Sequence, residues 1–332
     1  MRKFTSFILF SVFLILIIPA FALLGGDIKS NVPKQNNPIS KTDYEENNFY
    51  LVKNVDTNEV MRITPSDYIK GVVAAEMPID FHSEALKAQA VAAHTYALRQ
   101  IDEQLKNPNP DLDGAYLSTD YTKFQAYSSN EDLKTKWGKD FNLNYKKLSE
   151  CVDSVINEVL TYEDAPIAAA FHSISSGKTE SAKNVWGQDI SYLSPVVSVG
   201  DELSPSFENT VTLTDQEVAH AILQEFPDAK FPKDRSKWFV ITKKSESNTI
   251  TEIKIGSVTT TGKVIRELLK LKSANFTVDF KDSSFTFVTS GYGHGVGMSQ
   301  YGADYMARQG SDYKEILLHY YSGVSIDPIK QK

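Results

Sequence analysis

Apolar residues run almost without a break from Phe7 to Leu24, and two cations, Arg2 and Lys3, precede them. A stretch of about 18 apolar residues is long enough to cross the hydrocarbon core of a bilayer. The cations favour a cytoplasmic N-terminus and an exported remainder. Residues 1–26 are therefore expected to form a transmembrane anchor. The alternative is a cleaved signal peptide, for which Ala20-Phe21-Ala22 is an acceptable cleavage site, and both interpretations export the rest of the chain.

The pattern changes after residue 26. Residues 27–48 are rich in Asn, Lys, Pro and Glu and hold few large apolar side chains. Such a segment buries too little apolar surface to offset the entropy lost on ordering. We expect a flexible tether here, followed by one extracytoplasmic domain over residues 49–325.

Two short apolar runs, at residues 49–52 and 60–63, flank turn residues and predict a pair of strands. A helix is predicted from about Thr64 to Met77, because a proline follows and the residue before a proline disfavours helical geometry. Ser83 is expected to cap a second helix that runs to about Leu105. Its apolar residues recur at helical spacing and form one stripe, made of Leu86, Ala90, Ala93, Ala97 and Ile101.

The remainder of the chain mixes both patterns. Residues 146–158 are predicted to be a helix and 167–171 a short buried strand. A β-rich lobe is expected over about 206–290, and two closing helices are predicted at 298–309 and 312–320. The expected fold class is α+β: a helical core with a β-rich lobe, behind the membrane segment and the tether.

Composition narrows the function classes. The chain has 332 residues, 41% of them hydrophobic, which is enough for a sizeable core. The formal charge of −7 argues against a nucleic-acid binder, which needs a basic face. The single cysteine, Cys151, excludes an intramolecular disulfide and lies in the predicted helix at 146–158, as a small buried hydrophobe would. The six histidines include no close pair at metal-ligand spacing.

One acid carries candidate chemistry. Glu76 ends a helix and follows Val72-Val73-Ala74-Ala75. The negative end of the helix dipole and the apolar neighbours both disfavour its charged form, so its pKa should be raised. A carboxyl group of that kind can act as a general acid near neutral pH. An exposed glutamate at a helix end is the alternative. Lys87 and His94 lie seven residues apart and so share a face of the next helix.

Three separated blocks resemble the stage II sporulation protein D family. The first is Val73–Pro78 with Glu84–Tyr96, the second is His172–Glu180 with Val185–Gly187, and the third is Gly291–Gly302. They occur in the order of the family and span most of residues 49–325. Together they are far more specific than any one block.

The resemblance implies a membrane-anchored lytic transglycosylase that cuts peptidoglycan glycan strands between N-acetylmuramic acid and N-acetylglucosamine during engulfment in sporulation. The helical core would then be catalytic, with Glu76 as the general acid and base. The substrate-site positions of the family fall on Lys87, Gln89, His94 and Tyr96. His94 departs from the usual arginine, which weakens any contact with a carboxylate.

Further substrate-binding positions are expected in the later blocks. Gln125 and Tyr127 match a Gln-x-Tyr element of the family, and Ser175 lies in the second block. Trp186 could stack on a sugar face, although a lone tryptophan is more often part of a core. The alternating glycines at 291–297 would let backbone approach a sugar, with hydrogen bonds from His294 and Gln300; a tight strand-to-helix connection is the alternative.

The resemblance also bears on metals, partners and location. Some family members bind zinc just before the Gln-x-Tyr element, but residues 118–124 contain no Cys or His here, so no zinc and no cofactor are expected. The implied partners are the amidase stage II sporulation protein P and the membrane protein M, at the septal or engulfing membrane of the mother cell. Related domains occur in amidase enhancers, so a glycan-binding protein that stimulates an amidase without cutting is the rival function.

Overall fold

The protein is described here by a computed structural model that covers residues 49–329. The predicted anchor at 1–26 and the predicted tether at 27–48 lie outside the described residues. Within residues 49–329, no helix is both long and apolar enough to cross a bilayer.

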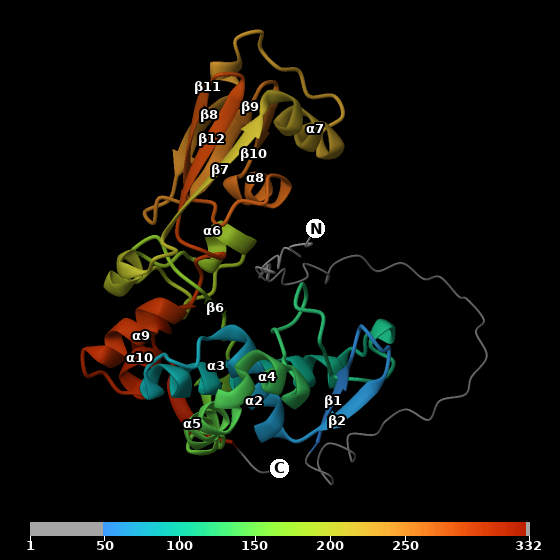
Figure 1. The fold of residues 1–332 in the computed structure, drawn as a ribbon, viewed down its shortest axis with the longest axis vertical. Coiled ribbons are helices and arrows are strands. Elements are labelled where there is room, and N and C mark those ends of the chain that lie inside the picture. The colour runs from blue at the N-terminus through green and yellow to red at the C-terminus, as the bar shows by residue number, and fades with distance from the viewer. Residues whose placement is uncertain (1–48, 330–332) are drawn as a thin grey trace, which may run out of the picture.

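The described chain folds into two parts that stand one above the other in Figure 1. The helical body comprises residues 49–205 and 291–329, and the β-rich lobe comprises residues 206–290. Each part encloses its own cluster of buried apolar side chains. The mixture of helices and sheets agrees with the predicted α+β class.

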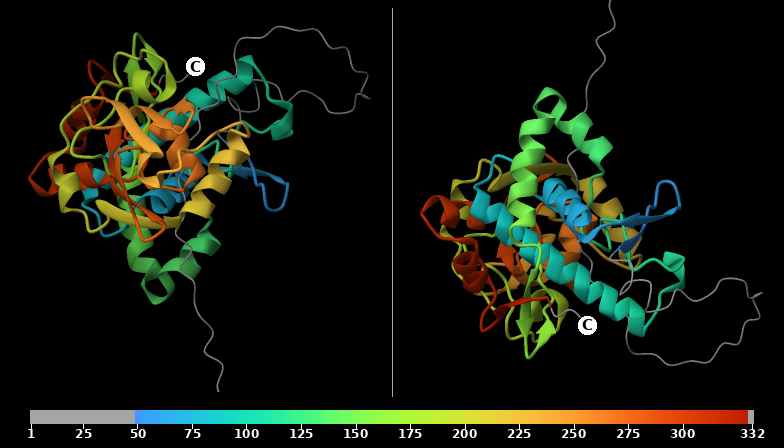
Figure 2. Two further views of the ribbon diagram at one scale, coloured as in Figure 1. Left: turned by 90° about the horizontal axis from the view of Figure 1, so that it is seen from above. Right: turned by 90° about the horizontal axis from the view of Figure 1, so that it is seen from below.

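Helices α2 (Pro65–Glu76) and α3 (Ser83–Lys106) form the centre of the helical body. The Thr64 hydroxyl caps the start of α2, which ends at Met77 before the proline, as predicted. The imidazole of His82, rather than Ser83, caps α3. The helix α3 crosses the whole body when seen from below (Figure 2), and its apolar stripe is buried along that path.

Short elements surround this helical pair. The other helices of the body are α4 (Asn130–Trp137), α5 (Phe141–Asp153), α6 (Ala182–Trp186), α9 (Gln300–Arg308) and α10 (Tyr313–Tyr320). The strands form three small sheets, with orders β2-β1-β3, β13-β6 and β14-β4-β5. They are β1 (Tyr50–Lys53), β2 (Val60–Ile63), β3 (Leu117–Ser118), β4 (Glu158–Tyr162), β5 (Ala165–Pro166), β6 (Phe171–His172), β13 (Met298–Ser299) and β14 (Ser325–Pro328).

The β-rich lobe packs two antiparallel three-stranded sheets with two helices. The sheet orders are β10-β9-β8 and β11-β12-β7. Aromatic rings join the sheets, for instance Phe239 against Phe285 and Phe287. The elements are β7 (Glu208–Thr214), α7 (Asp215–Glu225), β8 (Phe239–Lys244), β9 (Ile250–Ile255), β10 (Val258–Thr260), α8 (Gly262–Leu268), β11 (Phe276–Lys281) and β12 (Ser284–Ser290).

The chain enters and leaves the lobe at one place. The first strand, β7, pairs with the last, β12, along their whole length, so that Glu208 lies opposite Ser290. The Gly291 amide then donates to the Phe207 carbonyl at 2.7 Å. The lobe is thus an insertion whose two connections run side by side, and residue 291 begins a segment that returns directly to the helical body.

Two predicted elements are wrong in their bounds by more than two residues. The helix predicted at 146–158 is α5, which ends at Asp153, and Val159 belongs to β4. The strand predicted at 167–171 is only the two-residue pairing at β6. Both errors have the same cause, because a short apolar run fits a buried strand and a buried helix equally well. Helix α4 was not predicted, although Ser129 and Asp132 form a capping box at its start.

Candidate active site

The carboxyl group of Glu76 lies at the C-terminal end of α2 and is 9% exposed. One oxygen accepts a hydrogen bond from the Ala126 amide at 3.0 Å. The other accepts from the side-chain amide of Gln300 at 3.4 Å. The carboxyl group is therefore held from two sides by groups that are 50 and 224 residues away in the sequence.

Burial raises the pKa of Glu76 to about 7, even though the hydrogen bonds from Ala126 and Gln300 act in the opposite direction. No cation among residues 49–329 contributes to this pKa. A carboxyl group with a pKa near 7 is present in both protonation states at neutral pH, so it can donate a proton and take one back.

The loop that carries Ala126 is fixed against α2. The side chain of Gln125 is 1% exposed and donates to the Ala93 carbonyl at 3.2 Å. The ring of Tyr127 stacks on Tyr68, with centroids 5.6 Å apart and planes 11° apart. Gln125 therefore positions the amide of Ala126 rather than presenting its own side chain at the surface, while Tyr127 is half-buried beside it.

Two tyrosines complete the surroundings of Glu76. Tyr68 precedes it by two turns on the same face of α2, and Tyr96 approaches from α3. The charge of Glu76 helps to raise the pKa of both phenols, although burial is the larger cause. Tyr96 was predicted as a site residue and Tyr68 was not. The eight-residue spacing from Tyr68 to Glu76 is the sequence signal that could have identified it.

The other predicted residues of α3 lie away from solvent or away from Glu76. His94 is 2% exposed, and its Nε2 is 2.7 Å from the Tyr50 hydroxyl. Burial lowers the pKa of His94 to about 4, so the ring is neutral at pH 7. Lys87 forms an ion pair with Glu84 at 2.7 Å. Neither residue lies against the Glu76 carboxyl group, so for both the substrate-binding role stays a prediction that these contacts do not support.

Gln89 differs from both of these residues. It is fully buried, and neither polar atom of its side chain has a hydrogen-bond partner among residues 49–329. It lies one turn before Ala93 on the face of α3 that also carries Tyr96. That face is directed toward the Gln125 side chain, which donates to the Ala93 carbonyl.

Gln300 is placed by a buried network that sequence reasoning missed. The Asp201 side chain is fully buried and accepts hydrogen bonds from the Ser175 amide at 3.0 Å and from the hydroxyls of Ser175 and Ser299. Ser299 caps α9, the helix that Gln300 begins. Ser175 is 1% exposed, and its amide and hydroxyl both donate to Asp201. Its contacts indicate that it positions the segment rather than touching a ligand.

The alternating glycines pack against protein backbone. A Cβ on Gly297 would lie 2.0 Å from the Ala170 carbonyl oxygen, and one on Gly293 would lie 2.9 Å from the His172 Cβ. Both glycines have positive φ, at +73° and +118°. These positions are filled by the chain itself, so the structure favours the tight connection over a close approach to sugar.

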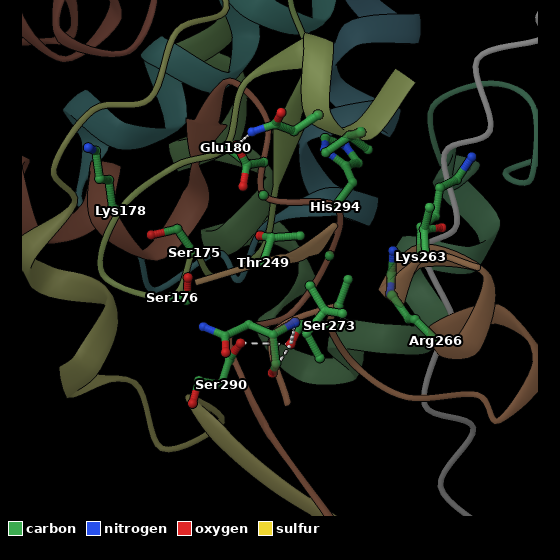
Figure 3. Close-up of a pocket in the computed structure, with 18 of the residues that line it drawn as sticks. Ser175, Ser176, Lys178, Glu180, Thr249, Lys263, Arg266, Ser273, Ser290 and His294 are labelled. Atoms are coloured by element: carbon green, nitrogen blue, oxygen red, sulfur yellow. Dashed lines mark hydrogen bonds between the residues drawn. The ribbon is translucent and has the colours of Figure 1, made fainter. Parts of the chain in front are cut away.

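A second polar region lies where the helical body meets the β-rich lobe (Figure 3). It is a pocket of about 710 Å³, the open solvent at its mouth included. Trp186 and His294 line it from the body, with ring centroids 5.2 Å apart. Arg266 and Lys263 line it from α8. The structure therefore brings Trp186 and His294 together, but at this pocket, whereas Gln300 lies at Glu76.

Comparison with known proteins identifies the family. The stage II sporulation protein family (SpoIID) matches residues 53–162. Stage II sporulation protein D of Bacillus amyloliquefaciens is 36% identical over 293 residues, which cover 88% of this chain and 80% of that protein. The chain belongs to the stage II sporulation protein D family. Its relative of that name in Bacillus subtilis (strain 168) is 37% identical over 267 residues, 80% of this chain and 75% of the relative.

A second kind of relative is more distant. The amidase enhancer of Bacillus subtilis (strain 168) is 28% identical over 312 residues, which cover 78% of this chain but only 40% of that protein. This similarity bears on the choice between glycan cleavage and stimulation of an amidase.

The zinc site of some family members does not fit the residues present. Residues 118–124 offer hydroxyl groups, Lys123 and one carboxylate, Asp120, whose Oδ1 accepts from the Thr122 amide and hydroxyl. Zinc prefers thiolate and imidazole ligands. No group of three or more His, Cys, Asp or Glu that could hold a metal is found within residues 49–329. Cys151 is buried in α5.

Proposed function

We propose that this protein is a lytic transglycosylase that cleaves peptidoglycan glycan strands between N-acetylmuramic acid and N-acetylglucosamine, with Glu76 as general acid and then general base. The observation that carries the proposal is the Glu76 carboxyl group itself. It is buried, its pKa is raised to about 7, and it is oriented by the Ala126 amide and by Gln300.

The reaction needs one such group. Protonated Glu76 donates its proton to the glycosidic oxygen as the bond from that oxygen to C1 of N-acetylmuramic acid breaks, which releases the 4-hydroxyl of N-acetylglucosamine. The Glu76 carboxylate then takes the proton of the 6-hydroxyl of the muramic acid as O6 bonds to C1. The product is a 1,6-anhydro ring, no water is consumed, and Glu76 ends in its starting state.

A hydrolase of the usual kind needs two carboxyl groups that flank the bond, one of them as nucleophile or as base for water. Within residues 49–329, the hydrogen-bond partners of the Glu76 carboxyl group are the Ala126 amide and Gln300, and no second carboxyl group is bound to it. Asp201, the other deeply buried acid described above, is engaged with the hydroxyls of Ser175 and Ser299. The surroundings of Glu76 therefore support transglycosylation over hydrolysis.

The decisive experiment is product analysis after incubation of the protein with purified glycan strands. Anhydro-muramic ends are expected with the wild type and none with Glu76→Ala, while folding and glycan binding persist. Glu103→Ala is the matched control, since Glu103 is a half-exposed glutamate of α3 paired with Arg99. Reducing muramic ends would show hydrolysis instead, and product from a folded Glu76→Ala protein would refute the catalytic role.

The second candidate is a glycan-binding protein that stimulates an amidase without cutting. The similarity to an amidase enhancer favours it. A binder has no need for a carboxyl group with a pKa near 7 in an apolar setting, so the Glu76 site argues for the enzyme. If the protein accelerates an amidase and Glu76→Ala does so equally, while neither releases anhydro-muramic ends, the second function is correct.

We further propose that the protein acts at the mother-cell membrane together with the amidase stage II sporulation protein P and the membrane protein M. The amidase would remove stem peptides before the glycan is cut. This order predicts faster cleavage of amidase-treated wall than of peptide-bearing wall by the same enzyme preparation. Equal rates on the two substrates would refute the order of action and leave the transglycosylase activity itself untouched.

A further inference from the structure

The strongest unassigned feature is a buried cation. Arg266 of α8 is 7% exposed and lines the pocket between the helical body and the β-rich lobe. Among residues 49–329, neither a hydrogen bond nor an ion pair satisfies its guanidinium group. A guanidinium group stays charged at every physiological pH, so it cannot escape the cost of burial by losing a proton.

The neighbouring charges are already engaged. Glu267 is adjacent to Arg266 in sequence and lies 3.9 Å from Lys263, its partner one helical turn away. Glu180, on the opposite wall of the pocket, accepts from the Ser181 amide, the Asn184 side chain and the Ser245 hydroxyl. The charge of Glu267 still acts favourably on Arg266, but no carboxylate within residues 49–329 forms an ion pair with it.

The pocket also has an aromatic wall. The positive charge of Arg266 disfavours protonation of His294, which places the guanidinium within electrostatic reach of that ring. Trp186 packs against the same ring. A ligand beside Arg266 therefore meets an indole and an imidazole on one side and the donors of α8 on the other, as Figure 3 shows for His294 and Arg266.

We propose that this pocket binds a sugar that carries a carboxylate, with Arg266 pairing with the carboxylate and Trp186 packing against the sugar ring. A guanidinium group offers two parallel N–H donors to a carboxylate. The indole suits the apolar face of a pyranose ring, and the pocket is open to solvent, so a sugar could reach the indole from outside. A simple inorganic anion would use the cation and leave the aromatic wall without a role.

The choice of ligand rests on the proposed function. Muramic acid whose stem peptide has been removed carries a free lactyl carboxylate, whereas N-acetylglucosamine has no acidic group. The pocket would then distinguish stripped strands from peptide-bearing strands, because an amide-linked peptide removes the carboxylate from the position beside Arg266. This gives the preferred order of cleavage a physical basis in the β-rich lobe.

The test is calorimetric titration of the full-length protein with three ligands: N-acetylmuramic acid, N-acetylglucosamine and lactate. The first should bind about tenfold or more tightly than either of the others, since only it has both the ring and the carboxylate. None of the three contains a glycosidic bond between two sugars, so the outcome is independent of catalysis. Equal affinity for the two sugars, or no measurable binding of either, would refute the site.

Variants locate the contact. Arg266→Gln should lose about tenfold or more in affinity for N-acetylmuramic acid and leave N-acetylglucosamine unaffected. Arg235→Gln, in the same lobe but exposed and paired with Asp215, is the matched control. Trp186→Phe is a second variant, which keeps the charge of Arg266 and should lower the affinity for both sugars. If Arg235→Gln and Arg266→Gln lost the same affinity for N-acetylmuramic acid, Arg266 would not be the residue that binds the carboxylate.

Discussion

Glu76 and Arg266 are both buried ionisable groups, but one lies in the helical body and the other in the β-rich lobe. A carboxyl group can adapt to burial by keeping its proton, and the pKa of Glu76 rises to about 7 as a result. A guanidinium group has no such choice, so Arg266 remains charged, with the nearby charge of Glu267 but no ion pair among residues 49–329. The same physical cost therefore favours an acid catalyst in one place and an anion-binding site in the other.

The largest expected effect on stability comes from a substitution in the segment that joins the Glu76 site to the pocket beside Arg266. Residues 291–300 carry both His294, in the pocket, and Gln300, at Glu76. Gly297→Ala should reduce the free energy of unfolding by about 4 kcal/mol, because its Cβ would lie 2.0 Å from the Ala170 oxygen and its φ is +73°. Urea unfolding measures the change.

Gly323→Ala is the matched control for this variant. Its φ is +70°, close to that of Gly297, but no atom lies within 4 Å of the place where its Cβ would stand, so only the backbone cost of about 1 kcal/mol should remain. Equal losses in the two variants would show that the tight contact with Ala170 contributes nothing.

The second prediction separates the two ionisable groups by pH. The folded pKa of Glu76, about 7, exceeds its ordinary value of 4.5, so its contribution to stability is complete below pH 4.5 and is lost as pH rises through 7. Glu76→Gln has no carboxyl group to titrate at this position. Its free energy of unfolding should therefore exceed that of the wild type by up to about 3 kcal/mol at pH 8. Arg266→Gln should leave the fall in stability through pH 7 unchanged, because Arg266 does not contribute to the pKa of Glu76. Unfolding curves at pH values from 5 to 8 measure both, and a pH-independent effect of Glu76→Gln would contradict the raised pKa.

The third prediction concerns the support of Gln300. Asp201→Asn should cost about 2 kcal/mol of stability and should also slow glycan cleavage, because Ser175 and Ser299 donate to different oxygens of the carboxylate and an amide has only one acceptor oxygen. Asp189→Asn, at an exposed position in the loop after α6, serves as control and should change neither quantity. Thermal unfolding and product formation are measured on the same samples. A stable Asp201→Asn protein of full activity would remove this network from the mechanism.

The fourth prediction uses the acid role directly. The leaving oxygen needs protonated Glu76, so the rate of glycan cleavage should fall above pH 7, by up to about tenfold for each further pH unit. Initial rates of product formation between pH 5 and 9 provide the profile. A rate that stays constant from pH 7 to 9 would show that proton donation by Glu76 does not limit the reaction.

The smallest effect is expected on metal removal. The residues at 118–124 do not provide zinc ligands, so incubation with a chelator should leave both cleavage and sugar binding unchanged. Metal analysis of the purified protein accompanies the assay. About one zinc per chain, together with activity that is lost in chelator and restored by zinc, would overturn this expectation.

Much of the framework follows from local signals. The end of α2 at Met77 follows from the proline, and the apolar stripe between Leu86 and Ile101 predicts the buried face of α3. The apolar run before Glu76 indicates a raised pKa, which the structure also shows. These predictions succeed because each depends on residues within one or two helical turns.

The contacts of individual side chains were harder to predict from the sequence. His94 and Gln125 carry polar groups that suggest a binding surface, yet both are buried and bind within the protein. Their sequence neighbours on α3 and in the loop do not reveal this, because burial depends on which element packs on top. Asp201 was missed for the same reason, since the serines that bind it lie 26 and 98 residues away.

The order of elements, the acid at the end of α2 and the membership of the family can all be read from the amino-acid sequence. Only folding reveals that Gln300, 224 residues away, orients that acid, and that Arg266 of an inserted lobe shares a pocket with Trp186 of the helical body. Helix capping and hydrophobic periodicity act between near neighbours and can be read along the chain. Desolvation and pairing of buried charges depend on every group that packs around them, which only the folded arrangement specifies.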